Sequence, residues 1–272
     1  MTADPPAGQS TKPKADFSDL VTRVISAVVL IGVGIGLAWV GGDAFGVLLV
    51  IAAGLMGWEL SRMHSPAPMV HYAFGLVLAG LTISTLFLPW VWSLGIGVLA
   101  LGAAFLGHRP PVRVVFWAAA IVVTCLILFR IRDWAGFPAT VLFFAIVAAS
   151  DIGGYFAGKL IGGPKILPKI SPKKTWSGTL GGWVLAAIVG GVGGPMVGLT
   201  FPTFGIVAGA ILLAVAAQIG DLMESLMKRR AGVKDSSTLI PGHGGLLDRF
   251  DGVIGAAVAL FLALQFIAVQ AG

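Results

Sequence analysis

The segment Ser225–Asp251 gathers acidic and basic side chains between two long apolar stretches. Asp248 and Asp251 are three residues apart, so both project on one side of the chain if a helix begins near Leu246. Together with Asp221, just upstream, they could supply the carboxylate oxygens that Mg²⁺ prefers as ligands. The spacing therefore indicates a metal site where this polar segment meets the apolar chain.

Carboxylates alone would repel a phosphate-bearing substrate, but the same segment also carries basic side chains. These are Lys228, Arg229, Lys234 and Arg249. The PGHGG turn, Pro241–Gly245, lets the backbone approach a ligand closely, and its His243 could donate a hydrogen bond to phosphate or relay a proton. Simple solvent exposure is the alternative for this histidine. The combination of acids, cations and a glycine-rich turn favours a metal–phosphate centre.

Ionisable side chains also occur inside or at the ends of apolar stretches, where a charge in hydrocarbon is costly and usually marks function. Asp151 directly follows the apolar run VLFFAIVAAS. Asp221, Glu224, Ser225 and Lys228 are spaced i, i+3, i+4 and i+7, so they share one helical face. An internal ion pair with Lys228 is an equally good interpretation of Glu224.

A second polar segment, Ile161–Gly178, is dense in groups that can bind phosphate. The candidates are Ser171, Lys173, Lys174 and Thr175. The neighbouring Trp176 could anchor the membrane interface or stack on a base. Juxtamembrane lysines beside an interfacial tryptophan are also what any cytoplasmic membrane edge contains, so both interpretations stay open for this segment.

The elements that must position these residues are membrane helices. The chain has 272 residues, of which 57% are hydrophobic and 11% charged, and its mean hydropathy is +0.96. Apolar runs of membrane-spanning length recur along it, which predicts an all-α polytopic integral membrane protein. We expect about nine transmembrane helices, or eight if the hairpin at Pro89 is re-entrant. They lie near Val21–Val40, Ala44–Leu60, His71–Leu88, Pro89–Leu106, Val112–Phe129, Pro138–Phe156, Thr179–Val197, Gly205–Met227 and Gly252–Val269.

Charge sets the expected orientation, because Lys and Arg in short loops stay on the cytoplasmic side. With a cytoplasmic N-terminus, all 18 Lys and Arg residues except Arg130 and Arg132 fall on that side. This asymmetry predicts an odd number of spans with the C-terminus outside. It also places the loops 157–178 and 228–251 on the cytoplasmic face. Nucleic-acid binding is not expected, since the basic residues sit against membrane spans and no soluble domain presents them.

Three regions follow from this pattern. Residues 1–19 are polar and rich in Pro and Lys, which predicts a disordered N-terminal tail. Residues 20–137 hold the N-terminal transmembrane helices, and residues 138–272 form a catalytic transmembrane region with both polar loops. The first five spans could line a lipid cavity, form a homodimer interface, or do both.

The segment Ser225–Asp251 closely resembles the signature of the phosphatidate cytidylyltransferases, the CDP-diacylglycerol synthases. The residues that carry the resemblance are Ser225, Lys228-Arg229, Lys234-Asp235, His243-Gly244-Gly245 and Asp248-Arg249-Phe250-Asp251. The resemblance extends to Gln218–Ser225, Asp151–Gly162 and Ser171–Gly178, so it covers roughly the C-terminal half. Gly154 stands where the family usually has Ala, a small departure.

The resemblance implies a Mg²⁺-dependent transfer of a cytidylyl group from CTP to phosphatidate, for phospholipid biosynthesis. It implies a multi-pass protein of the inner (plasma) membrane, surrounded by membrane lipids, whose site faces the cytoplasm. Asp221 and Asp248 would hold the metal, supported by Asp251 and Asp151. The expected catalytic set is Asp221, Lys228, Asp248 and Asp251. The expected substrate-binding set is Ser171, Lys173, Lys174, Thr175, Ser225, Arg229, Lys234, Asp235, His243 and Arg249.

Two other functions compete with this one. A CTP-dependent kinase of a polyprenol or phytol alcohol would share a membrane-embedded metal site, but its product would carry phosphate without cytidine. An ion-coupled transporter would also use acids within spans, as at Asp151 and Asp221. Transporters commonly place their site at the midplane between internal repeats, whereas here the charges cluster toward one face and no convincing repeat is evident.

Overall fold

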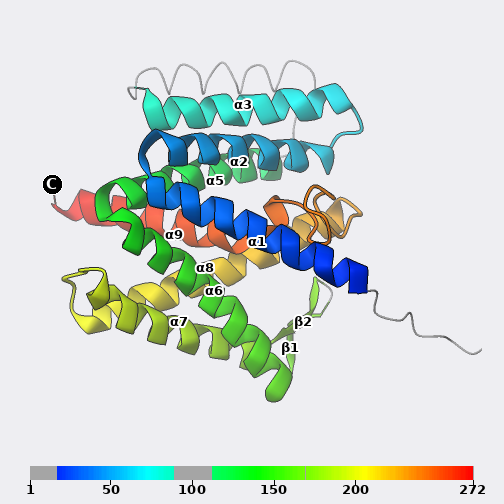
Figure 1. The fold of residues 1–272 in the computed structure, drawn as a ribbon. Coiled ribbons are helices and arrows are strands. Elements are labelled where there is room, and N and C mark those ends of the chain that lie inside the picture. The colour runs from blue at the N-terminus through cyan, green and yellow to red at the C-terminus, as the bar shows by residue number, and fades with distance from the viewer. Residues whose placement is uncertain (1–16, 89–111, 169, 272) are drawn as a thin grey trace, which may run out of the picture.

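A computed structural model describes residues 17–88, 112–168 and 170–271, and Figure 1 shows it as a bundle of long helices with one small hairpin. The helices of the N-terminal part are α1 (Phe17–Val40), α2 (Gly42–Arg62), α3 (Pro68–Phe87) and α5 (Val112–Arg130). A π-helical turn, Ile131–Ala135, leads into α6 (Gly136–Leu160). The remainder comprises strands β1 (Lys165–Leu167) and β2 (Ser171–Thr175), then α7 (Trp176–Met196), α8 (Thr203–Arg230) and α9 (Leu247–Ala271).

Seven helical segments in the described part are long and apolar enough to cross a membrane, which confirms the polytopic class. The longest, Val112–Leu160, has 49 residues, roughly 74 Å of helix and more than twice the thickness of a hydrocarbon core. It contains both α5 and α6, because Gly136, at φ 82°, breaks the helix between them. Eight of the nine predicted spans thus coincide with described helices, while Pro89–Leu106 lies outside the described residues.

Several predicted boundaries were wrong by a few residues. Helix α1 begins at Phe17, within the region 1–19 predicted as tail. The loop predicted at 157–178 is shortened by α6 and α7 and contains the antiparallel β1–β2 hairpin. Helix α7 starts at Trp176 because the Thr175 side chain accepts a hydrogen bond from the Gly178 N–H at 3.1 Å and caps it.

The second loop was also predicted too long, since α8 runs on to Arg230 and α9 already begins at Leu247. The ion pair between Glu224 and Lys228 supports the last turns of α8, and the basic residues at its end suit the negative end of the helix dipole. The connecting loop is therefore 231–246.

The helices pack in two ways. The larger core lies where α2, α5 and α9 meet and is made of apolar side chains such as Met56, Ile121 and Ala256, all fully buried. Helices α6 and α7 approach much more closely through glycines: a Cβ added at Gly153 or Gly178 would collide with backbone of the other helix. Outward-facing residues of α1 are apolar and exposed, as a lipid-facing surface requires.

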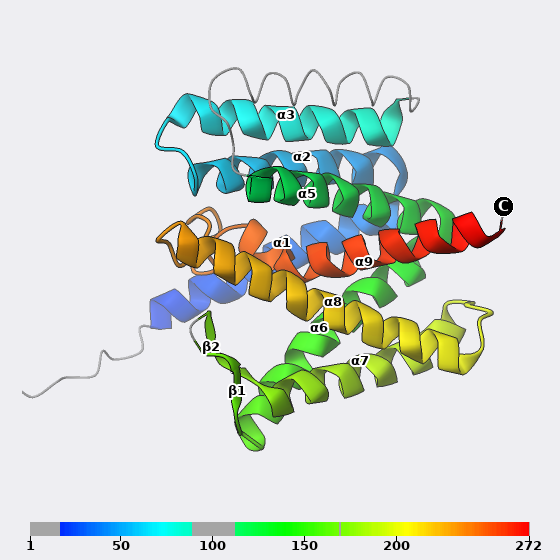
Figure 2. The same cartoon turned by 180° about the vertical axis from the view of Figure 1, so that it is seen from behind.

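The polar segments gather at one end of the bundle. The start of α1, the turn between α2 and α3, the β1–β2 hairpin and the loop 231–246 all lie toward the same side in Figures 1 and 2. The C-terminus of α9 lies at the opposite end. Both predicted functional loops thus share one face of the molecule.

Candidate active site

An ion pair connects the two polar segments. Lys174, on β2, places its Nζ atom 2.6 Å from Oδ2 of Asp221 on α8. The same ammonium group lies 3.5 Å from the backbone carbonyl of Gln218, one turn earlier on α8. Ser225 donates to Oδ1 of Asp221 at 3.3 Å. Lys174 and Asp221, 47 positions apart in the sequence, therefore meet, as the predicted two-loop site requires.

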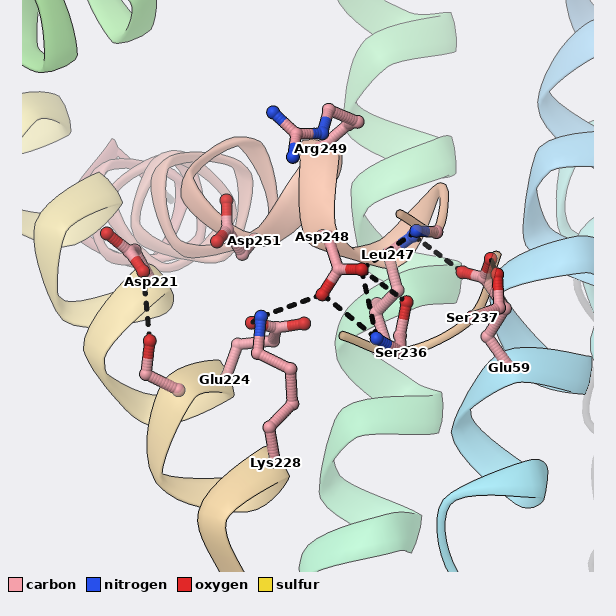
Figure 3. Close-up of polar contacts among 12 residues, drawn as sticks. Glu59, Asp221, Glu224, Lys228, Ser236, Ser237, Leu247, Asp248, Arg249 and Asp251 are labelled. Carbon is pink, nitrogen blue, oxygen red and sulfur yellow. Dashed lines mark hydrogen bonds and ion pairs between the residues drawn. The ribbon is translucent and has the colours of Figure 1, made fainter. Parts of the chain in front are cut away.

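Carboxylates gather around Asp221. Figure 3 shows Asp221 on α8 and Asp251 on α9 facing each other across the gap between the two helices. Asp151 on α6 interacts electrostatically with both Asp221 and Asp251. The helices can bring these groups together because Gly220 and Gly255 allow α8 and α9 to touch: a Cβ at Gly220 would collide with the carbonyl oxygen of Asp251.

Lys228 lies at the centre of a second, more buried cluster. Its ammonium group forms ion pairs with Glu224, one turn earlier on α8, and with Asp248 on α9, where Nζ and Oδ1 are 2.7 Å apart. Only 12% of the Lys228 side chain is exposed, and Glu224 is fully buried. The internal ion pair considered for Glu224 is thus present. Lys228 also ties the end of α8 to the start of α9.

Asp248 lies in a different setting from the one predicted for it. Oδ2 accepts hydrogen bonds from the backbone N–H and the hydroxyl of Ser236, at 2.9 and 3.0 Å, and from the Gly245 N–H at 2.8 Å. Oδ1 is held by Lys228 (Figure 3). The loop 231–246 wraps over this carboxylate, which helical spacing alone could not anticipate. Asp248 is joined to Lys228 and the loop, whereas Asp251 faces Asp221.

The predicted residues of the PGHGG turn touch helix α1. The Ser26 hydroxyl lies 3.0 Å from the carbonyl oxygen of Pro241 and forms a hydrogen bond of 2.9 Å with Nδ1 of His243. Arg249 donates to the His243 carbonyl at 2.8 Å. Gly242 and Gly244 adopt φ of 74° and 83°, a backbone conformation that favours glycine. The turn is therefore folded against α1 and α9.

The other predicted residues divide into surface and structural groups. Arg229, Lys234 and Asp235 are exposed at the edge of the site, as is Lys173 on β2. Ser171 is half-buried at the start of β2. Thr175 is buried, where it caps α7. The exposed cations remain available to a ligand, while the Thr175 side chain is committed to the fold.

One residue of the site was missed from the sequence. Glu59, on α2, is fully buried, and its carboxylate accepts hydrogen bonds from Ser237, Leu246 and Leu247. It is an acid in an otherwise apolar run, AAGLMGWELSR, which is a signal that could have singled it out. Its partners lie 178 to 188 residues later, and no local pattern predicts such a pairing.

The acidic residues fit Mg²⁺ in kind but do not form a closed cage. No group of three His, Cys, Asp or Glu side chains that could hold a metal ion is found within residues 17–88, 112–168 and 170–271. Mg²⁺ is ordinarily bound by one or two carboxylates, with water and substrate phosphates completing its shell. The facing pair Asp221 and Asp251 matches that donor set (Figure 3).

Comparison with known proteins shows the family of the chain. The chain matches the sequence profile of the cytidylyltransferase family over residues 21–267. A phosphatidate cytidylyltransferase of Brucella suis biovar 1 (strain 1330) is 40% identical over 255 residues, covering 90% of this chain and 93% of that protein. Another, from Rickettsia bellii (strain RML369-C), is 30% identical over 257 residues, covering 90% of each chain. The matched range spans nearly the whole chain, and the chain belongs to the cytidylyltransferase family.

Proposed function

We propose that this protein transfers a cytidylyl group from CTP to phosphatidate. A phosphate oxygen of phosphatidate forms a bond to the α-phosphorus of CTP, the bond from that phosphorus to the α–β bridging oxygen breaks, and pyrophosphate leaves. The products are CDP-diacylglycerol and pyrophosphate. The observation that carries the proposal is the family match, which spans nearly the whole chain and relates it to proteins named for this reaction.

The geometry of the site suits that chemistry, because transfer between phosphates depends on positioning and charge neutralisation more than on covalent catalysis. A phosphate monoester is already anionic near neutral pH and needs no strong base. Lys174 and Lys228 bring positive charge from β2 and α8 into the site. The exposed Arg229, Lys234 and Arg249 surround them at its rim. In this proposal the partly buried Lys174 and Lys228 position the triphosphate, and the exposed cations at the rim attract the anionic substrates.

The residues that would hold Mg²⁺ are Asp221 and Asp251, with Asp151 nearby. When bound, Mg²⁺ would neutralise phosphate charge and stabilise the leaving pyrophosphate. Lys174 would then share Asp221 with the metal and connect the β1–β2 hairpin to it. We assign Asp248 a different role from the one predicted, namely holding Lys228 and the loop 231–246 in place.

The membrane arrangement completes the proposal. We propose nine spans in the inner membrane, with the end that carries the β1–β2 hairpin and loop 231–246 facing the cytoplasm. The distribution of Lys and Arg supports this orientation. The acyl chains of phosphatidate would stay in the bilayer while its headgroup meets CTP at that face.

Labelled CTP tests the reaction directly. The purified protein is incubated in detergent with phosphatidate, Mg²⁺ and CTP labelled on either the α- or the γ-phosphate. We expect the α-label in the lipid product and the γ-label in pyrophosphate. Lipid labelled only from the γ-position would show a lipid kinase instead, and would refute the proposal. The variant Asp221→Ala serves as the control for contaminating activity.

A further inference from the structure

Glu59 contacts the loop 231–246, although it lies on α2 and not in either polar segment. It lies near the end of α2, with no part of its side chain exposed. Oε1 accepts from the Ser237 hydroxyl at 2.6 Å and from the Leu246 N–H at 2.9 Å, while Oε2 accepts from the Leu247 N–H at 2.7 Å. All three donors belong to the loop 231–246 or the first residue of α9. A single buried side chain therefore holds both ends of the segment 237–247.

Glu59 and Asp248 accept hydrogen bonds from different groups of the loop 231–246. Adjacent serines point to different carboxylates: Ser236 donates to Asp248 and Ser237 donates to Glu59. Adjacent backbone amides do the same, since the Gly245 N–H donates to Asp248 and the next two donate to Glu59. Gly245 has no room for a side chain, because a Cβ there would collide with Ser236 and Glu59. The second glycine of the His-Gly-Gly sequence is explained by this double contact.

Apolar packing alone does not explain a carboxylate at the buried position of Glu59. A buried carboxylate is costly unless its oxygens are hydrogen-bonded, and an apolar residue of similar volume would avoid that cost. Within the described residues no basic side chain forms an ion pair with Glu59. Its stabilisation comes from the loop's hydroxyl and amides, and from the positive end of the α9 dipole. Among the described residues, the carboxylate is thus hydrogen-bonded to the site loop and the first residue of α9.

We propose that Glu59 is a positioning residue: it holds loop 231–246 and the first turn of α9 so that Asp248 stays directed at Lys228. The link is continuous, because Glu59 fixes the amides next to the one that binds Asp248, and Asp248 contacts the Lys228 ammonium group. Its catalytic consequence rests on the proposed function, but the contact itself does not.

Hydrogen exchange measured on the purified protein without substrate tests the contact. Glu59→Gln keeps the shape of the side chain but replaces one acceptor oxygen with an NH₂ group, so it cannot accept all three hydrogen bonds. We expect faster exchange confined to residues 236–247, with the other helices unchanged. The matched control is Asp43→Asn, the same loss of charge on the exposed first turn of α2. Unchanged exchange in Glu59→Gln, or faster exchange spread evenly over the helices, would overturn the proposal.

Kinetics test the consequence. Misplaced catalytic groups lower the rate of the chemical step, so we expect kcat of Glu59→Gln to fall by about 10²-fold while KM for CTP changes less than about threefold. Ser237→Ala removes one of the three bonds without altering α2, and should show a smaller fall in kcat with the same exchange pattern. A normal kcat, or a rise in KM alone, contradicts positioning. If the wild-type protein makes no CDP-diacylglycerol, the proposed function fails, yet the exchange experiment still decides the contact.

Discussion

Lys174 and Asp221 form an ion pair that joins the β1–β2 hairpin to helix α8, with 2.6 Å between Nζ and Oδ2. Each side chain is partly exposed, so the contact can be reached from outside the fold. A cation paired with a carboxylate can exchange partners when a phosphate arrives. The hairpin is therefore expected to respond to nucleotide through this lysine.

Neighbouring lysines on β2 should give different kinetic defects. Lys174→Ala removes the ion pair to Asp221 and should lower kcat by about 10²-fold, since it disturbs a charged group at the reaction centre. Lys173 is exposed and has no hydrogen bond or ion pair to a described residue, so Lys173→Ala should raise KM for CTP or phosphatidate and leave kcat nearly unchanged. Steady-state kinetics with each substrate varied in turn separate the two. Equal defects would mean that the ion pair has no special role.

The facing aspartates should control the metal requirement. Asp221→Asn and Asp251→Asn each replace one carboxylate oxygen with an NH₂ group, and the resulting neutral amide binds Mg²⁺ less well. We expect the Mg²⁺ concentration for half-maximal activity to rise by at least about tenfold in each variant. Titration of CDP-diacylglycerol formation against Mg²⁺ measures this. An unaltered titration curve in both variants would place the metal elsewhere.

Asp248 should behave differently from this pair. Asp248→Asn weakens the contacts to Lys228, Ser236 and Gly245, so turnover should fall by about 10²-fold through misplacement of Lys228. Because Asp248 is assigned no metal, the half-maximal Mg²⁺ concentration should stay within about twofold of wild type. A large increase in the Mg²⁺ requirement would instead restore the metal role predicted from the sequence.

Two glycines on α8 provide a matched test of helix packing. Gly220→Ala puts a methyl group against the Asp251 carbonyl oxygen and Gly255, and overpacking of this kind is expected to destabilise by about 1–3 kcal/mol. Gly209→Ala meets nothing within 4 Å and should keep or raise stability, because alanine favours helix. Thermal unfolding in detergent compares the two variants. We further expect only Gly220→Ala to lose turnover, since it separates Asp221 from Asp251.

Much of the fold could be predicted because lipid imposes a simple pattern on the sequence. Helices that cross a bilayer need about 20 apolar residues, so runs such as Val21–Val40 and Gly205–Met227 predicted α1 and α8 within a few residues. The i,i+4 spacing likewise indicated the pair formed by Glu224 and Lys228 as one of two interpretations, and the structure contains that pair. Helix ends were less predictable, because the Thr175 cap and the β1–β2 hairpin depend on local hydrogen bonds rather than on hydropathy.

The details of the site depended on tertiary contacts that no spacing reveals. The spacing of Asp248 and Asp251 predicted only that both lie on one side of a helix, yet one is enclosed by the loop and the other faces Asp221 (Figure 3). Glu59 lies 178 residues before Ser237, and their hydrogen bond exists only after α2 and α9 pack together. A resemblance concentrated in the C-terminal half could not draw attention to a residue in the N-terminal half.

The buried position of Glu59 has a consequence for how the protein can be divided. An excised fragment beginning at residue 138 would contain every predicted site residue. The Leu246 and Leu247 amides at the start of its α9 would, however, lack their acceptor, Glu59. Such a fragment should be inactive by itself. Co-production with a separate piece carrying α2 should restore activity, and that complementation should fail when the piece carries Glu59→Gln.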